Sequence, residues 1–358
     1  MQRTLAAVLA LALAVACGDS ARNADTPASG AAAPAKNATS GADLTGAGAT
    51  FPYPLYSKWF DAYSAKAGVK INYQAIGSGG GIRQLSEQTV DFGGTDAPMT
   101  DAELAKAKGG SILHIPTALG AVALIYNLGG VTQPLKLTGD VLAAIYQGQV
   151  TKWSDARIAS LNPGVTLPSA DILVVHRSDG SGTSYVFTDY LASVSPAWAT
   201  KPGKGKEVQW PVGLGGKGND GVAGQVKQTP GAIGYVELAY ANQNKLSTAV
   251  LRNAAGEYVA PTIASVTAAA AGASAKLPAT TDYRLSIVNA GGTGVYPISS
   301  FTWIILYQKQ ADPMKGKKVV DFLKWALGDG QAMEAPLDYA PLPDAMKTAL
   351  LARLETVK

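Results

Sequence analysis

The chain has 358 residues, of which 47% are hydrophobic and 16% charged, a composition typical of a globular protein large enough for two ordinary domains or one large one. Its formal net charge of +4 is small for this length, and no run of lysine and arginine stands out, which argues against nucleic-acid binding and against a polybasic membrane patch. The 40 glycines, often beside serine or threonine, indicate tight turns and close approaches of the backbone to a ligand.

The N-terminus has the pattern of an export signal. Arg3 gives a short positive segment, and residues 5–16 form an apolar run too short to span a bilayer comfortably. Cys17, the only cysteine, follows that run directly, as in bacterial lipoproteins, where this cysteine is lipidated and becomes the mature N-terminus. Ordinary cleavage after Ala16 is the alternative. Because an unpaired cysteine is an unusual liability in an exported protein, we predict a lipoprotein-type signal peptide over residues 1–17, with lipidation at Cys17.

Residues 18–42 are predicted to be a disordered, flexible tether. They consist of alanine, serine, glycine and other small or polar residues, with almost no large apolar side chain. Such a segment cannot bury enough surface to offset the entropy lost on ordering. A tether directly after a lipidated cysteine is what a membrane-anchored domain needs.

From Leu44 onward, strand-like and helix-like segments alternate. We expect strands over 69–76, 171–178, 231–238 and 301–309, a loop over 77–81, and helices over 82–90, 137–148, 183–194, 317–333 and 343–357. The apolar run 111–128 predicts one or two buried strands with a break near Pro116, and Thr138 is expected to cap the helix after it. The low-complexity segment 267–276 is expected to be a surface helix or loop. The alternation predicts an α/β fold with mostly parallel sheets.

Three segments share one design, a loop rich in glycine, serine or threonine that leads into a predicted helix. A helix N-terminus offers unpaired N–H groups and a partial positive charge, and hydroxyl groups add donors, so each loop could bind an anion. One such loop is more often a simple turn, whereas three of them with an arginine favour an oxyanion site. The residues concerned are Thr50 and Phe51 before Pro52, Ser78 in the second loop, and Ser181, Gly182 and Thr183 in the third.

Arg177 ends an apolar strand just before the third glycine loop. A guanidinium group at this position could bind an oxyanion through two parallel hydrogen bonds. The alternative is a surface arginine paired with nearby Asp179. Both interpretations hold together if Asp179 orients the arginine.

Asp96, in the stretch VDFGGTDAPMT, is the other unusual residue. A carboxylate beside a bound anion is unfavourable unless that anion carries a proton to donate. Phosphate carries a proton at neutral pH and sulfate does not, so one aspartate could accept from phosphate and repel sulfate. Taken alone, Asp96 could equally be a helix N-cap or a turn residue before the stretch PMTDAEL.

Several stretches together resemble one known family, the periplasmic phosphate-binding proteins of bacterial ABC phosphate importers. They occur in the family's order and run from Leu44 nearly to the end of the chain. The stretches are LTGAGATFPYPLYSKW, INYQAIGSGGGIRQL, VDFGGTDAPMT, RSDGSGTSYVFTDYL, WPVGLGGKGNDGVAGQV, PGAIGYVELAYA and LDYAPLP.

The resemblance implies a two-lobed, hinged class II binding-protein fold that closes on phosphate. It implies that Asp96 accepts the phosphate proton and that Arg177 makes the ion pair. It further implies donors from the three helix starts, namely Thr50, Phe51, Ser78, Ser181, Gly182 and Thr183. Gly79 stands where the family often has a second serine, so we do not expect it to be a ligand. His176 stands where an arginine can precede the phosphate-binding one.

Enzymatic activity is the first alternative function, with a phosphate-ester hydrolase as its natural form. Asp179 occupies the first glycine position of a nucleophile elbow around Ser181, so that pattern is absent. His114 and His176, the only histidines, lie in apolar strand patterns and are expected to be core or sheet residues rather than bases or metal ligands. A P-loop also fails, because Gly218 follows the Gly-Lys pair.

Two further alternatives stay open at the level of sequence. One is a binding protein for another tetrahedral oxyanion, such as sulfate or molybdate, which Asp96 argues against. The other is a surface protein that kept a phosphate-binding fold without transport.

We therefore predict two α/β lobes joined by two crossovers, with 43–116 plus 294–358 as lobe one and 117–293 as lobe two. The expected ligand is inorganic phosphate, bound by hinge closure and passed to the permease and ATPase subunits of an importer. We expect a monomer on the periplasmic face, without cofactor, metal ion, nucleic acid or catalytic activity.

Overall fold

The computed structural model describes residues 43–274 and 281–358, so the predicted signal peptide, the tether and Cys17 lie outside the described residues. The described part is built on a nine-stranded sheet of order β2-β1-β3-β12-β4-β8-β6-β7, with β9 also paired to β4, and a small sheet β11-β10-β5. The strands are β1 (Leu44–Gly48), β2 (Ile71–Ala75), β3 (Phe92–Thr95), β4 (Ile112–Tyr126), β5 (Lys136–Leu137), β6 (Leu173–Arg177), β7 (Leu214–Gly216), β8 (Ala232–Glu237), β9 (Ser247–Thr248), β10 (Val250–Arg252), β11 (Tyr258–Val259) and β12 (Ser299–Tyr307).

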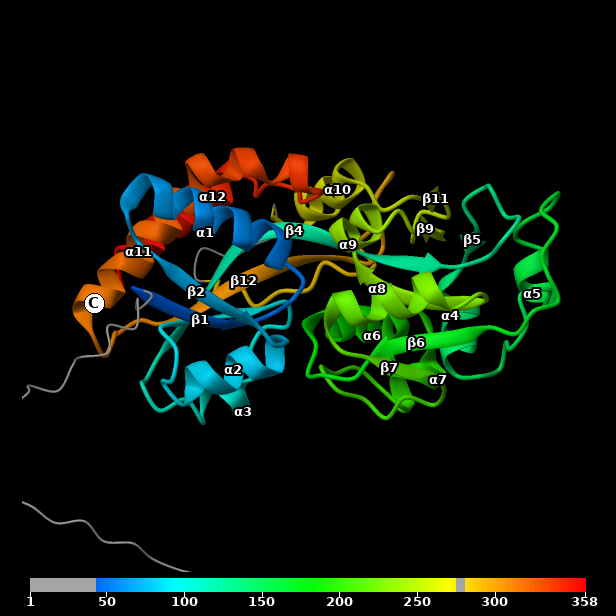
Figure 1. The fold of residues 1–358 in the computed structure, drawn as a ribbon, viewed down its shortest axis with the longest axis horizontal. Coiled ribbons are helices and arrows are strands. Elements are labelled where there is room, and N and C mark those ends of the chain that lie inside the picture. The colour runs from blue at the N-terminus through cyan, green and yellow to red at the C-terminus, as the bar shows by residue number, and fades with distance from the viewer. Residues whose placement is uncertain (1–42, 275–280) are drawn as a thin grey trace, which may run out of the picture. The chain divides into compact units, whose positions relative to one another are not determined.

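Strand β4 belongs to both halves of the large sheet. Its first part pairs antiparallel with β12 as far as Ala121, and from Val122 onward it pairs antiparallel with β8. We call the half with β1, β2, β3 and β12 the first lobe and the half with β6, β7 and β8 the second lobe. Figure 1 shows β4 running from one lobe into the other. All fifteen residues of β4 are buried, as expected for a strand shared between two cores.

The expectation of mostly parallel sheets is wrong for the centre of the sheet. Pairs β1–β2, β1–β3, β6–β7 and β6–β8 are parallel, whereas β12 and β4 run antiparallel to their neighbours. The predicted break near Pro116 is also not a break in the strand. It is a register shift, in which Trp303 pairs with Pro116 and Thr302 with Ala118. Proline cannot donate to a ladder, and a bulge accommodates it without ending the strand.

The helices that the structure describes include the predicted ones, with shifted ends. They are α1 (Tyr53–Ala67), α2 (Ser78–Ser86), α3 (Asp101–Leu104), α4 (Gly139–Tyr146), α5 (Ala156–Ala159), α6 (Gly182–Val194), α7 (Pro196–Thr200), α8 (Gly218–Gln228), α9 (Leu238–Gln243), α10 (Ile263–Ser274), α11 (Pro313–Leu327) and α12 (Asp344–Leu354), with 3₁₀ turns at Asp329–Met333 and Ala335–Leu337. Thr138 precedes α4 as expected, but its side chain makes no capping hydrogen bond.

Helix α2 begins inside the glycine run that was expected to be a loop. A β-carbon at Gly81 would lie 2.5 Å from the carbonyl oxygen of Ala47, so the helix packs directly on the backbone of β1. Only glycine permits this approach, which is why poor helix formers stand in a helix here.

Each lobe has an aromatic core. In the first lobe, Tyr56, Trp59 and Phe60 of α1 are buried, and Phe60 contacts Phe322 of α11. In the second lobe, the rings of Phe187 and Tyr235 stack at 4.2 Å. Burying side chains of this size stabilises the fold by roughly 1.5–3 kcal/mol each.

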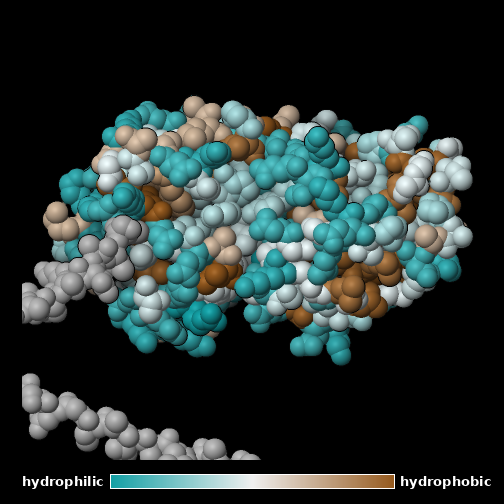
Figure 2. Space-filling view, in the orientation of Figure 1, coloured by the Kyte–Doolittle hydropathy of each residue, from teal (hydrophilic) through white to brown (hydrophobic). Residues whose placement is uncertain are grey.

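Helix α10 covers most of the low-complexity segment, in which Ala269 and Ala270 are fully buried and Thr267 and Ala271 are exposed, so the described part of this segment is a helix with one packed face and one exposed face. Figure 2 shows a mostly hydrophilic face with a hydrophobic area on the second lobe. Leu173 and Leu214 are among the exposed large apolar residues. Among the residues that the structure describes, none of the helices has the length and apolar character needed to cross a bilayer.

Candidate functional site

The helix starts singled out from sequence lie where the two lobes meet. The N–H of Gly79 at the start of α2 donates to the carbonyl of Gly180 in the second lobe at 2.8 Å. A β-carbon on Gly182, the first residue of α6, would lie 2.4 Å from Ser78 Oγ and 2.5 Å from Asp96 Oδ2. The backbone of α6 therefore faces Ser78 and Asp96 directly, and the first N–H groups of this helix, which have no intrahelical partner, lie beside them.

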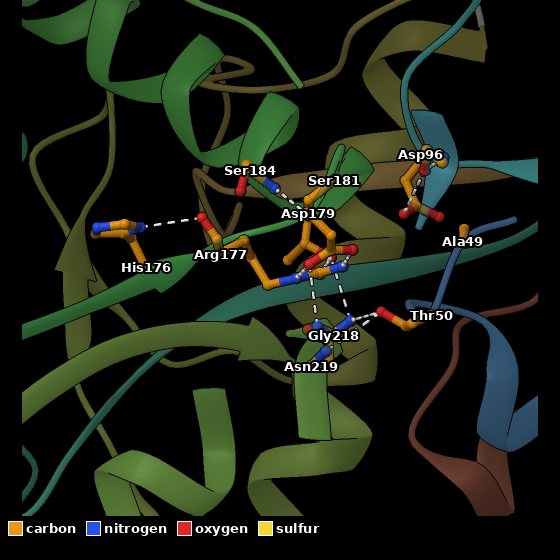
Figure 3. A network of polar contacts seen from close by, with 12 residues as sticks. Ala49, Thr50, Asp96, His176, Arg177, Asp179, Ser181, Ser184, Gly218 and Asn219 are labelled. Carbon is orange, nitrogen blue, oxygen red and sulfur yellow. Dashed lines mark hydrogen bonds and ion pairs between the residues drawn. The ribbon is translucent and has the colours of Figure 1, made fainter. Parts of the chain in front are cut away.

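Arg177 is buried, with 3% of its surface exposed, and it is held by Asp179. Nε donates to Asp179 Oδ1 at 2.8 Å and Nη2 to Oδ2 at 2.5 Å. Asp179 also accepts from the N–H of Gly218 at 3.0 Å. Burial disfavours the Asp179 carboxylate, but the hydrogen bonds and charge of Arg177 outweigh it and hold the pKa of Asp179 below its usual value. The pairing with Asp179 is present and fixes the plane of the guanidinium (Figure 3), but Arg177 is buried and is not the surface arginine of the alternative interpretation.

The third loop uses its hydroxyl groups to shape the start of α6. Ser181 Oγ accepts from the N–H of Ser184 at 3.0 Å and so caps the helix. Thr183 Oγ1 accepts from Arg177 Nη1 at 3.2 Å. The proton of each hydroxyl group is left for a further acceptor.

Asp96 is a buried carboxyl group and not a cap or an exposed turn residue. Thr302 Oγ1 donates to Oδ1 at 2.8 Å, and Ser78 Oγ lies 3.4 Å from Oδ2. The helix after it is capped by Thr100 instead. Burial raises the pKa of Asp96 to about 7, against the opposing effects of Thr302, Arg177 and Ser78. At neutral pH this group is poised to share a proton with whatever faces it.

The start of α1 is held by two tyrosines that sequence analysis did not single out. Tyr240 of α9 donates to the carbonyl of Thr50 at 2.5 Å, and Tyr339 donates to the carbonyl of Phe51 at 2.6 Å. With their carbonyls engaged, the Thr50 hydroxyl and the backbone at Phe51 keep one orientation. Thr302 was likewise missed, because one threonine in an apolar strand carries no signal of its own.

Asn219 is the fourth missed residue. It lies at the start of α8, fully buried, and its Nδ2 donates to Thr50 Oγ1 at 2.8 Å and to Thr183 Oγ1 at 3.2 Å. It therefore links a predicted site residue of the first lobe to one of the second (Figure 3). The only signal was its place in the stretch WPVGLGGKGNDGVAGQV, where it stands beside the glycine-lysine pair.

A cavity of about 530 Å³ adjoins Asp96. Its lining comes from both lobes and combines apolar side chains with polar and charged ones, the latter including Thr100, Tyr185, Asp189, Lys204 and Arg284.

The ion pair between Lys206 and Glu103 joins the lobes at the edge of the site. Lys206 Nζ, in the loop after α7, lies 2.7 Å from Glu103 Oε1 of α3. Desolvation opposes ionisation of Glu103, but Lys206 and Thr100 outweigh it and lower the pKa of Glu103. The backbone carbonyl of Lys206 also accepts from the N–H of Ser181, so this loop touches both the ion pair and the third helix start.

Replacing Glu103 by glutamine is expected to weaken anion binding modestly, by about two- to five-fold, because a partly exposed ion pair contributes up to about 1 kcal/mol. Titrations at low and high salt measure this, and the difference between variant and wild type should shrink as salt screens the pair. Asp329→Asn is the matched control, since Asp329 pairs with Lys66 inside the first lobe. Equal effects of the two substitutions would contradict a role for the contact between lobes.

The histidines do not form a catalytic arrangement. The ring of His114 is buried, its Nε2 accepts from the N–H of Met99 at 3.1 Å, and burial lowers its pKa to about 4. The ring of His176 stacks on Trp210 at 4.8 Å and points away from Ser181 in Figure 3. Within residues 43–274 and 281–358, no group of three or more His, Cys, Asp or Glu side chains is placed to hold a metal ion.

The chain is similar to known proteins along most of its length. Residues 31–329 match the model of the PBP superfamily domain. The chain is 48% identical over 314 residues to "Phosphate-binding protein PstS" of Xylella fastidiosa (strain Temecula1 / ATCC 700964), which covers 87% of this chain and 84% of that protein.

Two solved structures share the fold. One is a high affinity periplasmic phosphate-binding protein (PfluDING) bound with phosphate at pH 8.5, with a TM-score of 0.69, 23% identity, and coverage of 87% of this chain and 93% of the other. The second is a putative phosphate ABC transporter substrate-binding protein with bound phosphate from Clostridium perfringens, with a TM-score of 0.61, 19% identity, and coverage of 84% and 99%. At these identities the likeness shows the fold alone. It confirms the two-lobed periplasmic-binding-protein fold predicted from the sequence.

Proposed function

Since the chain belongs to the family of PstS phosphate-binding proteins, we propose that it binds inorganic phosphate between its lobes and delivers it to the permease of an ABC phosphate importer. The observation that carries the proposal is the cluster of donors from both lobes around one buried acceptor, Asp96. Relatives named for phosphate binding, and one solved structure described as an ABC transporter substrate-binding protein, support it.

In this proposal the ligand lies between the helix starts of both lobes. Arg177 binds the anion through its guanidinium, held in plane by Asp179, and Asp96 accepts the phosphate proton. The donors are the hydroxyl and backbone N–H groups of Thr50, Phe51, Ser78, Ser181, Gly182 and Thr183. Helix N-termini stabilise a bound anion. Burial of the bound anion strengthens its hydrogen bonds to these donors.

Closure of the lobes completes the site. We retain 43–116 with 294–358, and 117–293, as the boundaries of the lobes. They are supported by the two connections between the lobes, namely β4 and the segment before β12. In that segment Arg284 donates to the carbonyl of Met99 in the first lobe, and Ser286 donates to Asp189 of α6. A ligand that bridges both lobes shifts the equilibrium to the closed form, which is what the permease would recognise.

We also propose export to the periplasmic face, lipidation of Cys17, a monomeric state and no catalytic activity. Replacing Cys17 by serine should release the protein from the membrane fraction if lipidation anchors it. Phosphatase assays test the last point, and turnover abolished by Ser181→Ala would contradict it. Growth on limiting phosphate after deletion distinguishes transport from a surface protein that only binds.

Calorimetric titration of the purified domain with phosphate, arsenate and sulfate tests the proposed ligand. Phosphate should bind, and arsenate, which is protonated like phosphate, should compete. Sulfate should compete poorly because it has no proton for Asp96. Equal competition by sulfate at neutral pH would point to the alternative, a binding protein for tetrahedral oxyanions in general.

A further inference from the structure

Asn219 has one defined orientation between the lobes. Its Oδ1 accepts from the backbone N–H of Glu237 at 2.9 Å, so its amide nitrogen is the atom that faces the threonines. That nitrogen donates one proton to Thr50 Oγ1 at 2.8 Å and the other to Thr183 Oγ1 at 3.2 Å. The side chain is fully buried, and both of its polar atoms make hydrogen bonds.

These contacts fill the acceptor sites of both threonine hydroxyl groups. A hydroxyl group has one proton to donate and two lone pairs to accept with. Thr50 Oγ1 accepts from the backbone N–H of Asn219 at 3.3 Å as well as from its side chain. Thr183 Oγ1 accepts from Asn219 and from Arg177 Nη1, each at 3.2 Å. Each hydroxyl group is left with its proton alone, so each can act only as a donor toward a ligand.

We propose that Asn219 is a positioning residue that makes Thr50 and Thr183 obligate donors, and that it acts on Thr50 only when the lobes are closed. Thr50 belongs to the first lobe, whereas Asn219 and Thr183 belong to the second, so the contact with Thr50 forms on closure. Asp96 then remains the main acceptor toward the ligand, and the site selects an anion with one proton to give. This inference rests on the proposed function, because it concerns the same phosphate site.

Two substitutions of Asn219 are used to distinguish a positioning role of its side chain from a packing role. Asn219→Ala removes both donated hydrogen bonds, and phosphate affinity is expected to fall about 10- to 100-fold. Asn219→Asp keeps the size of the side chain and the acceptor for Glu237, but an ionised carboxylate would draw the protons of Thr50 and Thr183 toward itself. Binding by this variant should be weaker than by Asn219→Ala at high pH and should recover as the introduced carboxyl group takes up a proton.

The pH profile reports ionisation of the introduced carboxyl group in the site, and the readout that a packing role would not move is the loss of the Asn219→Ala effect in a Thr50→Val, Thr183→Val background. The phosphate dissociation constant of Asn219→Asp divided by that of Asn219→Ala should rise with pH by up to about tenfold per unit. Calorimetry from pH 5.5 to pH 9 measures both constants. Titration of phosphate itself cancels in this ratio. The neighbouring titratable groups are present in both variants, namely Asp96, Asp179, Asp220, Glu237 and Tyr240, and so is the guanidinium of Arg177.

Asn162→Ala is the matched control. Asn162 is also a buried asparagine of the second lobe, and it makes hydrogen bonds to Lys136 and Ile158 away from the site. Its loss is expected to lower the melting temperature but to leave phosphate affinity within about threefold. If Asn219→Ala does not fold, Asn219→Asp against wild type gives the same pH test.

The outcomes distinguish this inference from the proposed function. If wild type binds phosphate but Asn219→Ala binds as tightly as Asn162→Ala, or the ratio stays flat with pH, Asn219 has no positioning role. If wild type itself does not bind phosphate, the proposed function has failed. A large effect of Asn219→Ala that persists in a Thr50→Val, Thr183→Val background would also overturn the inference, because the asparagine would then act by another route.

Discussion

Replacing Arg177 by alanine is expected to weaken phosphate binding by on the order of 30- to 4,000-fold. Arg177 is buried and ion-paired with Asp179 through two hydrogen bonds. Removing the guanidinium takes away the cation proposed to face phosphate and leaves the Asp179 carboxylate in the site without its partner. Truncation of one member of a buried charged pair costs about 2–5 kcal/mol, and every 1.4 kcal/mol is a factor of ten in affinity. Calorimetric titration measures the loss.

The chain offers a close control for this experiment. Arg157 makes the same two-point contact with Asp155, through Nε at 3.0 Å and Nη2 at 2.9 Å, but on the surface of the second lobe. Arg157→Ala should leave phosphate binding unchanged. If both substitutions change affinity equally, or neither does, Arg177 does not bind the anion. Thermal unfolding of the unliganded variants shows whether Arg177→Ala is folded.

Replacing Asp96 by asparagine is expected to reduce the preference for phosphate over sulfate by on the order of 100-fold or more. An ionised Asp96 faces sulfate with like charge and no shared proton, whereas the asparagine amide can donate to sulfate. Competition titrations with both anions at pH 8 measure this preference. An unchanged preference in Asp96→Asn would mean that selectivity arises elsewhere in the site.

The pH dependence of sulfate binding follows from the same carboxyl group. Burial raises the pKa of Asp96 to about 7, so the group becomes protonated as pH falls below that value and can then donate to sulfate. Apparent sulfate affinity for wild type should therefore strengthen on acidification, by up to about tenfold per pH unit as pH falls toward 7, and should level off below that value. The same titration of Asp96→Asn should be nearly flat, because the amide does not titrate.

The stability of the unliganded protein provides an independent check. The native pKa of Asp96 lies above its unfolded value of 3.8, so the native state holds the proton more tightly, and stability is lost as pH rises toward 7. Between pH 5 and pH 8 this loss is roughly 2–3 kcal/mol and should be absent from Asp96→Asn. Burial raises the pKa of Glu237 and Glu334 in the same direction, but these groups are present in both proteins and cancel in the comparison.

Local sequence patterns predicted most of the elements because their signals are local. The apolar run of β8 and the helical spacing of α6 are each visible within about a dozen residues. Strand direction was not predictable in the same way. Strands β4 and β12 pair across almost two hundred residues of chain, and nothing in either segment states whether its partner runs parallel or antiparallel. The start of helix α2 was predicted four residues too late for a related reason, since the backbone of β1 requires the glycines that weaken its helical pattern.

The residues of the candidate site also divide into those that the sequence could predict and those that it could not. Arg177, Asp96 and the residues of the helix starts stand in conspicuous loops, and resemblance to a family assigned them roles. Thr302, Tyr240 and Asn219 act through a few hydrogen bonds to those residues from distant parts of the chain. A buried polar side chain of this kind has a meaning only when its partner is known. Position in three dimensions, rather than residue type, identifies it.

The contact between Gly79 and Gly180 has a consequence for how this site could change over time. A β-carbon at Gly79 would lie 3.3 Å from the α-carbon of Gly180, so in this region the lobes meet main chain to main chain. Such a contact cannot relax by a change of rotamer, and it gives the closed cleft a single width. Substitutions among the surrounding side chains can therefore vary the chemistry presented to an anion while the size of the space stays constant. Preferences for other anions of similar size are accessible to evolution by few substitutions, whereas larger ligands require a change in the backbone itself.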